Sequence, residues 1–156
     1  MGLRSGTENV PSLVGFSVAS ELAKKHLVSS RKQYQVLTKT FREIIEQKSK
    51  IIPLWLGNPK HQLANFIPVC FDGLDAERLI FKLEDRGIYV STGAACAASK
   101  GQKSHVLSAI GLSDSEIAGS LRITLGKDTT IEDIKTAADN LAEVVNLEAR
   151  RLKLID

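Results

Sequence analysis

One cysteine in an unusual setting is the first feature of the sequence that suggests chemistry. Cys96 stands within GAACAASKG, residues 93–101, where nearly every neighbour is alanine, glycine or serine. Because such small side chains offer little to pack, the stretch predicts an exposed loop between two anchored ends. Exposure is one condition for a reactive thiol, and a stabilised thiolate is the other, to which Lys100 and Lys103 contribute. The residues alone also allow a small side chain in a tight turn.

The other residues capable of chemistry give weaker signals. A metal centre is not predicted, because Cys96 has no second cysteine nearby and His105 lies nine positions further on. Cys70 stands in FIPVCF, a strand-like apolar run, and is expected to be buried as a small hydrophobic residue. His26 and His61 are expected at the surface.

Composition limits the classes of protein to consider. With 156 residues, 43% hydrophobic and 25% charged, the chain is expected to form one ordinary globular domain. The net charge of +3 is spread out without a basic stripe, so nucleic acid is not a predicted partner. No apolar run reaches the roughly 18 residues of a membrane span, and no secretory signal is recognisable. Two cysteines in different settings favour a reduced, cytoplasmic compartment.

A long amphipathic helix is predicted over residues 11–48. Pro11 suits its first turn, and apolar residues then recur every three or four positions, with a gap at Ser30. The pattern fits one helix, or two with a bend near residues 28–30. Its apolar stripe of about thirty residues is ~45 Å long. A four-stranded sheet is too small to cover that length, so either the helix curls back in two pieces or a partner surface lies outside this domain.

The rest of the chain predicts a small α+β domain, with helices on one face of a short, mostly antiparallel sheet. The expected strands are 51–56, 66–71, 88–91 and 120–125, and the expected helices are 72–86, 105–110 and one after a capping box of Thr129 with Glu132. Gly87 is expected to end the helix over 72–86, and Ser104 to cap the helix over 105–110. We therefore expect a helical segment, 1–48, followed by a domain, 49–156, that carries the cysteine loop 91–103.

Three stretches together resemble a known family. RSGTENVPSLVGF at 4–16, STGAACAASKGQKSHVLSAIGL at 91–112 and SLRITLGKDTTIEDI at 120–134 are similar to cysteine desulfurases, which are pyridoxal-phosphate enzymes of the class V aminotransferase group. The spacing from Cys96 to Ser104-His105 resembles the longer-loop type, which is associated with iron–sulfur cluster assembly. The resemblance implies the small C-terminal domain of a fold-type I pyridoxal-phosphate transferase.

The resemblance also implies roles for three residues. Cys96 matches the cysteine that takes sulfur from L-cysteine bound to pyridoxal phosphate, becomes a persulfide as alanine leaves, and passes the sulfur to an acceptor such as an iron–sulfur scaffold. Arg122 matches the arginine that holds the substrate carboxylate in bidentate fashion; without the motif, an edge-strand charge is the favoured interpretation. Thr7 matches a threonine that contacts the cofactor phosphate of the opposite subunit in the family's homodimer.

One family feature is missing from this sequence. The Schiff-base lysine typically follows a Ser-x-His pattern, but Ser104-His105 is followed by Val106 and Leu107. We therefore expect the chain to correspond to the C-terminal part of such an enzyme, to bind no pyridoxal phosphate alone and to show no turnover alone. In the family the long helix packs partly on the large domain, so the isolated chain is expected to self-associate through it. A non-catalytic persulfide carrier or docking domain, and a selenocysteine lyase relative, remain as alternatives.

Overall fold

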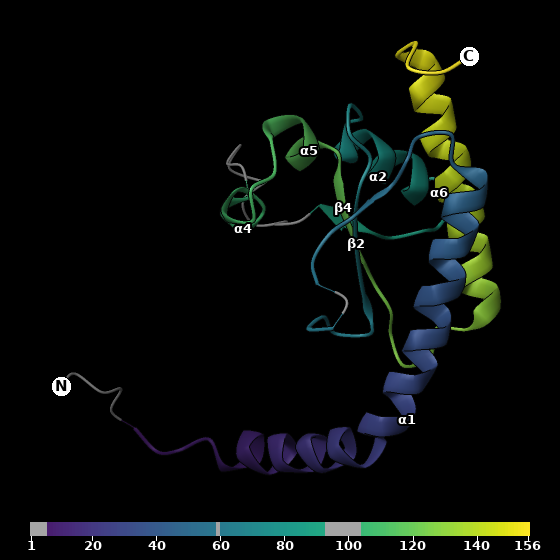
Figure 1. Ribbon diagram of the computed structural model, residues 1–156. Coiled ribbons are helices and arrows are strands. Elements are labelled where there is room, and N and C mark those ends of the chain that lie inside the picture. The colour runs from purple at the N-terminus through teal and green to yellow at the C-terminus, as the bar shows by residue number, and fades with distance from the viewer. Residues whose placement is uncertain (1–5, 59, 93–103) are drawn as a thin grey trace.

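The computed structural model describes residues 6–58, 60–92 and 104–156, which form an α+β arrangement (Figure 1). The elements in chain order are α1 Val10–Lys48, β1 Leu54–Trp55, β2 Phe66–Cys70, α2 Ala76–Glu84, β3 Ser91–Thr92, α4 His105–Ala109, α5 Asp114–Ala118, β4 Ser120–Thr124 and α6 Ile131–Arg151. The strands form one sheet in the order β1-β2-β4-β3, and each described pair is antiparallel. The predicted fold class is therefore confirmed.

One face of the sheet is covered by helices and holds the core. Ile67 and Val69 of β2 and Leu121 and Ile123 of β4 pack with buried side chains of α1, α2 and α6. Because side chains alternate across a strand, the residues between them point to the opposite face. Arg122 is one of these, and its side chain is half-buried.

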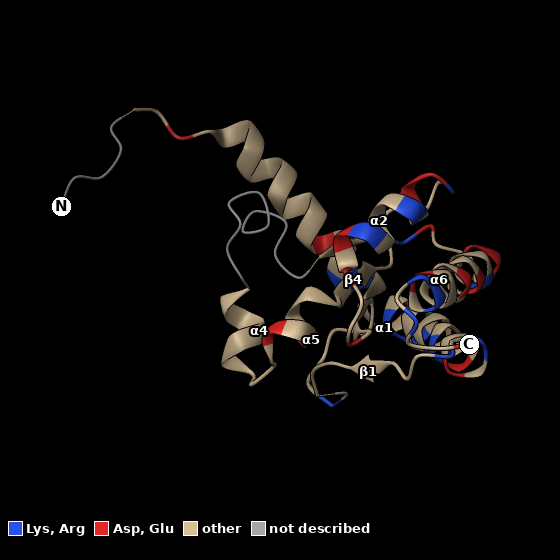
Figure 2. Cartoon of the chain, turned by 90° about the horizontal axis from the view of Figure 1, so that it is seen from above, with Lys and Arg blue, Asp and Glu red and all other residues tan. Residues whose placement is uncertain are grey.

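The long helix has two halves with different surroundings. α1 is a single helix whose axis turns midway, as Figures 1 and 2 both show. Near its middle, the Ser29 hydroxyl donates a hydrogen bond to the His26 carbonyl at 3.0 Å, a type of contact that accompanies helix bending. The second half packs against α6 and buries Leu37, Phe41 and Ile45. In the first half these large apolar side chains are all more than half exposed: Val10, Leu13, Val14, Phe16, Val18, Leu22, Leu27 and Val28.

Several predicted element limits are wrong for identifiable reasons. The strand predicted from 51 begins only at Leu54, after Pro53, which has no N–H to donate to a ladder. The strand predicted over 88–91 is instead Ser91–Thr92, because the Ile88 N–H is bonded to the Leu83 carbonyl. That bond belongs to the turn that ends α2, where Gly87 has the expected positive φ of 74°.

The start of α2 and the cap of α6 also differ from the predictions. α2 begins at Ala76 rather than at 72, because the Asp75 carboxylate caps it by accepting from the Glu77 and Arg78 N–H groups. The capping box of α6 consists of Thr130 and Asp133, one position beyond the predicted pair.

The predictions for Cys70 and for the two histidines His26 and His61 are confirmed. Cys70 is fully buried, and His26 and His61 are exposed. Cys96 lies outside the described residues. Within the described ranges, no helix is both long enough and apolar enough to cross a membrane.

Candidate functional site on the open face of the sheet

Arg122 is the charged residue at the centre of the sheet. It lies in β4 between two neighbouring strands, opposite Pro68 of β2 and Ser91 of β3. Its Nε atom is shielded from solvent and has no hydrogen-bond partner among the residues described. Buried polar groups in folded proteins are nearly always paired, so a guanidinium with a buried, unpaired N–H is unusual. Because arginine presents a planar fork of donors, the group that best completes this site is a carboxylate or a phosphate.

The sheet places the start of the cysteine segment beside this arginine. Ser91 is the partner of Arg122 across β3 and β4, Thr92 follows it, and the sequence then enters 93–103, which contains Cys96. The described chain resumes at Ser104, a buried residue whose hydroxyl caps α4 by accepting from the Leu107 N–H at 3.4 Å. Both ends of the segment are thus fixed to ordered elements, as the sequence predicted.

Thr7, the third predicted site residue, does not join this site within the chain. It is exposed and precedes Asn9, whose side chain caps α1 by accepting from the Ser12 N–H at 3.2 Å. The first half of α1, which Thr7 precedes, projects away from the sheet in both views (Figures 1 and 2).

The second thiol has the opposite environment from a reactive cysteine. Cys70 lies at the end of β2, opposite Ser120, and is fully buried. Burial raises its pKa to about 11, despite a hydrogen bond with Ser120 that lowers it. A thiol with this pKa is protonated at neutral pH and is a poor nucleophile. The backbone at Phe71 packs directly against Gly119, where an added Cβ would lie only 2.2 Å from the Phe71 carbonyl oxygen.

The described residues do not form a complete site for pyridoxal phosphate. That cofactor needs a lysine amine for its Schiff base, in a pocket that removes the amine from water. Every described lysine except Lys82 is exposed, and Lys82 is paired with Glu148 at 3.4 Å. The open face of the sheet therefore fits a carboxylate, through Arg122, but the described part of the chain offers no lysine for the cofactor. No group of three or more His, Cys, Asp or Glu side chains suited to a metal ion occurs in the described ranges.

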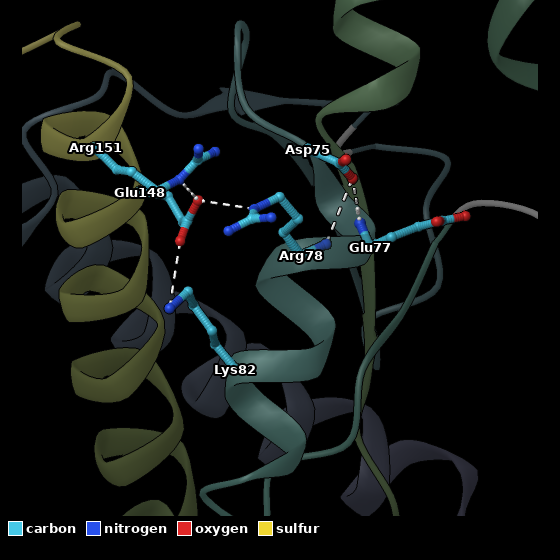
Figure 3. A network of polar contacts seen from close by, with 6 residues as sticks. All are labelled: Asp75, Glu77, Arg78, Lys82, Glu148 and Arg151. Carbon is cyan, nitrogen blue, oxygen red and sulfur yellow. Dashed lines mark hydrogen bonds and ion pairs between the residues drawn. The ribbon is translucent and has the colours of Figure 1, made fainter.

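A second ionic cluster, which the sequence analysis missed, joins α2 to α6. Figure 3 shows Glu148 of α6 with three cations around it: Arg151 Nε at 2.7 Å, Arg78 Nε at 3.1 Å and Lys82 Nζ at 3.4 Å. The Glu148 side chain is only 4% exposed, whereas the three cations are about half exposed. A glutamate in register with the buried Leu141 and Val145 was the available sequence signal. Because cations from both α2 and α6 contact the same carboxylate, this cluster is suited to holding the two helices together.

Comparison with known proteins agrees with this fold. A solved structure titled "NIFS-LIKE PROTEIN" superposes with a TM-score of 0.77 at 29% sequence identity, covering 94% of this chain and 36% of that one. A second, from Rickettsia africae and also described as NifS-like, gives a TM-score of 0.76 at 26% identity, with 90% and 36% of the two chains covered. The α+β fold of this chain is therefore one that NifS-like proteins contain.

Residues 1–136 match the family Aminotransferase class-V, and the chain belongs to that family. A "Cysteine desulfurase IscS" from Methanosarcina thermophila is 41% identical over 91% of this chain and 35% of its own length. "Cysteine desulfurase IscS 1" from Archaeoglobus fulgidus is 39% identical over 97% of this chain and 38% of its own length. The chain thus spans a little over a third of the length of these relatives.

Proposed function

We propose that this chain is the sulfur-accepting and substrate-binding domain of a cysteine desulfurase. Arg122 holds the carboxylate of L-cysteine, and Cys96 receives its sulfur as a persulfide, leaving alanine. Similarity to the cysteine desulfurases supports the reaction class. The observation that carries the proposal is the buried, unpaired Nε of Arg122 on the open face of the sheet.

The covalent distance along the chain allows Cys96 to reach a substrate that is held by Arg122. Cys96 is four residues beyond Thr92, and four residues span at most about 14 Å when fully extended. Thr92 pairs with Leu121, the neighbour of Arg122, so the thiol is tethered within reach of a substrate held at Arg122. A segment of small residues tied at both ends allows the thiol to meet a substrate on one side and an acceptor, such as an iron–sulfur scaffold, on the other.

Pyridoxal phosphate, the cofactor that withdraws electrons from the substrate in this family, requires groups beyond those described here. We therefore infer that the isolated chain does not turn over L-cysteine. A non-catalytic persulfide carrier is the second candidate function. It is favoured by the finding that each described lysine is either exposed or paired, which leaves no lysine for the cofactor among the described residues.

One experiment separates the two functions. The purified chain is mixed with L-cysteine and pyridoxal phosphate, with and without a separately expressed large domain of a related desulfurase, and alanine and sulfide are measured. We expect no turnover by the chain alone and turnover in the mixture. The Cys96→Ala variant is expected to abolish it, and the matched Cys70→Ala variant to retain it. Turnover by the chain alone would contradict the inference that the isolated chain is inactive, and activity that survives Cys96→Ala would contradict the role proposed for Cys96. If the mixture shows no turnover but Cys96 takes up the outer sulfur of an added low-molecular-weight persulfide, releasing the donor's thiol, the carrier would be favoured.

The uncovered half of α1 leads to a second part of the proposal. Figure 2 shows that the end of α1 nearest the N-terminus carries no charge, and its sequence has none from Val10 to Ser20. An exposed apolar surface of this extent is typical of an interface. We propose that another protein surface covers it, and that the isolated chain self-associates through it.

Sedimentation tests the self-association directly. The wild-type chain is expected to sediment as a dimer or larger species at high concentration. The Phe16→Glu variant is expected to shift toward the monomer, because it places a charge on a side chain that is 73% exposed within the apolar surface. Gln47→Glu adds the same charge at an exposed position in the second half of α1, outside this apolar surface, and serves as the control. A wild-type chain that stays monomeric would contradict the proposal.

A further inference from the structure

A groove away from the sheet face lies between the second half of α1 and the stretch 62–64 that precedes β2. It has a volume of about 390 Å³ and is lined by Arg31, Thr38, Arg42 and Gln62, among others. That size falls in the range of small-molecule sites. The Thr38 hydroxyl donates to the Ala64 carbonyl at 2.8 Å, so helix and loop are fixed to one another across the groove.

Two polar atoms at this groove are left without partners. Arg42 Nε and Gln62 Oε1 are both buried, and neither has a hydrogen-bond partner among the described residues. The Gln62 amide nitrogen is already used, since it donates to the Phe66 carbonyl. The Arg42 guanidinium lies over Trp55, with its central carbon 4.8 Å from the ring centroid, which holds its plane in one orientation. The groove therefore contains a preoriented guanidinium whose hydrogen bonds are incomplete.

The acidic residues of the groove form no ion pair with its arginines. Glu46 accepts a hydrogen bond from Trp55 Nε1 at 2.7 Å, and Glu43 pairs with Lys39 at 3.7 Å. Within the described part of the chain, no carboxylate lies within ion-pair distance of Arg31 or Arg42. With Arg31, Lys39 and Arg42 against Glu43 and Glu46, the groove lining has a net charge of +1, and its two arginines are the cations without an ion-pair partner among the described residues.

The spacing of the arginines indicates the kind of ligand. Arg31 and Arg42 are eleven positions apart, about three turns of helix, so they project from the same side of α1 with Cα atoms ~16 Å apart. We propose that the groove binds a small organic dianion, with Arg42 holding one anionic group and Arg31 the other. Guanidinium forks bind carboxylates and phosphates with the same bidentate geometry, so either group fits. This site is independent of the proposed desulfurase function.

The chain contains its own reporter for this site. Trp55 is its one tryptophan, and it lies directly against Arg42. We would titrate the full chain with succinate, inorganic phosphate and acetate at an ionic strength held constant with sodium chloride, following tryptophan fluorescence and calorimetry. Succinate is expected to give a saturable change with a Kd on the order of 1 mM, and acetate, with one anionic group, a weaker one. Tighter binding of succinate than of phosphate would support two-point binding, whereas tighter binding of phosphate, which has a single anionic group, would contradict it.

Three variants test the assignment of residues. Arg42→Lys keeps the charge but loses the fork, and is expected to weaken succinate binding about tenfold. Arg31→Gln leaves Trp55 and its stacking partner intact and is expected to weaken binding about threefold or more. Lys24→Gln removes an exposed cation from the other half of α1 and is expected to change nothing. Thermal unfolding confirms that each variant is folded.

The proposal also fails in either of two further cases. The first is the absence of a saturable signal for succinate and for phosphate once ionic strength is constant. The second is unchanged affinity, by calorimetry, in both Arg42→Lys and Arg31→Gln.

Discussion

The α2–α6 interface and the open face of the sheet each contain a buried ionic group, but only the one at the interface is paired with other side chains. At the interface, Glu148 is surrounded by three cations from the same chain. On the open face, the buried Nε of Arg122 has no partner among the residues described. A buried ion that is satisfied within the chain is costly to the fold when its partners are removed, whereas an ion left unsatisfied is a cost that a ligand can remove. We propose that this difference separates a structural charge, Glu148, from a substrate-binding charge, Arg122.

The Glu148 cluster shows what full satisfaction does to a carboxylate. Burial by itself raises the pKa of Glu148, but the hydrogen bonds from Arg151, Arg78 and Lys82 outweigh it and lower the pKa to about 2. Arg78 and Lys82 come from α2, whereas Arg151 shares α6 with Glu148 (Figure 3). One carboxylate therefore links two helices that cover the same face of the sheet.

The largest expected effect comes from removing the binding charge. In the enzyme reconstituted with a cofactor-binding domain, Arg122→Ala is expected to lower kcat/KM for L-cysteine by about 10²- to 10³-fold, because a preoriented charged donor is lost. Steady-state alanine production measures this. Thr124→Ala, on the same face of the same strand, is the matched control and is expected to have little effect. Equal losses in the two variants would mean that Arg122 acts through the strand and not through the substrate.

Removing the structural charge is expected to have the opposite signature. Glu148→Gln leaves three cations around a neutral amide and is expected to lower the free energy of unfolding by about 2–3 kcal/mol, somewhat less than for fully buried pairs because the cations are half exposed. Urea unfolding measures it. The control is Glu143→Gln, which breaks an ion pair with Arg86 in which the glutamate is 60% exposed; its expected loss is below ~1 kcal/mol. If Glu148→Gln were as stable as the Glu143→Gln control, the structural role of Glu148 would be contradicted.

Lowering the pH tests the contribution of the Glu148 charge in a second way. The folded pKa of Glu148, about 2, lies below its unfolded value of roughly 4.3. Its contribution to stability is therefore present above about pH 5 and is lost as pH falls toward 2. We expect the stability difference between wild type and Glu148→Gln to be constant from pH 7 to 5 and to shrink steadily below that. A difference that persists unchanged at pH 2 would show that the lost contribution is not the charge of Glu148.

These two sites also show what sequence can and cannot predict. Alternation along β4 is enough to place Arg122 on the face opposite Leu121, and the resemblance to desulfurases supplied its proposed role. Neither reveals that its Nε is buried without a partner, because that depends on strands from distant parts of the chain. The cluster at Glu148 is a similar case, since its two α2 cations lie about seventy residues away in sequence.

Local competition explains the errors in element limits. Thr129 and Thr130 are both followed three residues later by an acid, so the sequence allows two capping boxes. The structure uses the second because the Thr129 hydroxyl accepts a hydrogen bond from the Gly126 N–H at 3.0 Å instead. The short helix α5 was missed although Ser113 and Glu116 form a capping box, because five residues are too few to show an apolar period.

The smallest expected effect is the stability of a chain that has lost Arg122. Arg122→Met keeps an unbranched side chain of similar length but removes a buried donor that has no partner. Since an unsatisfied buried donor is unfavourable to the fold, we expect the free energy of unfolding to stay the same or to rise by up to ~1 kcal/mol, while the reconstituted activity falls as it does for Arg122→Ala. Urea unfolding of this variant beside Glu148→Gln measures both sites on one scale. A loss above ~2 kcal/mol in Arg122→Met would place Arg122 with Glu148 among the charges that hold the fold, because only a satisfied charge makes its removal that unfavourable.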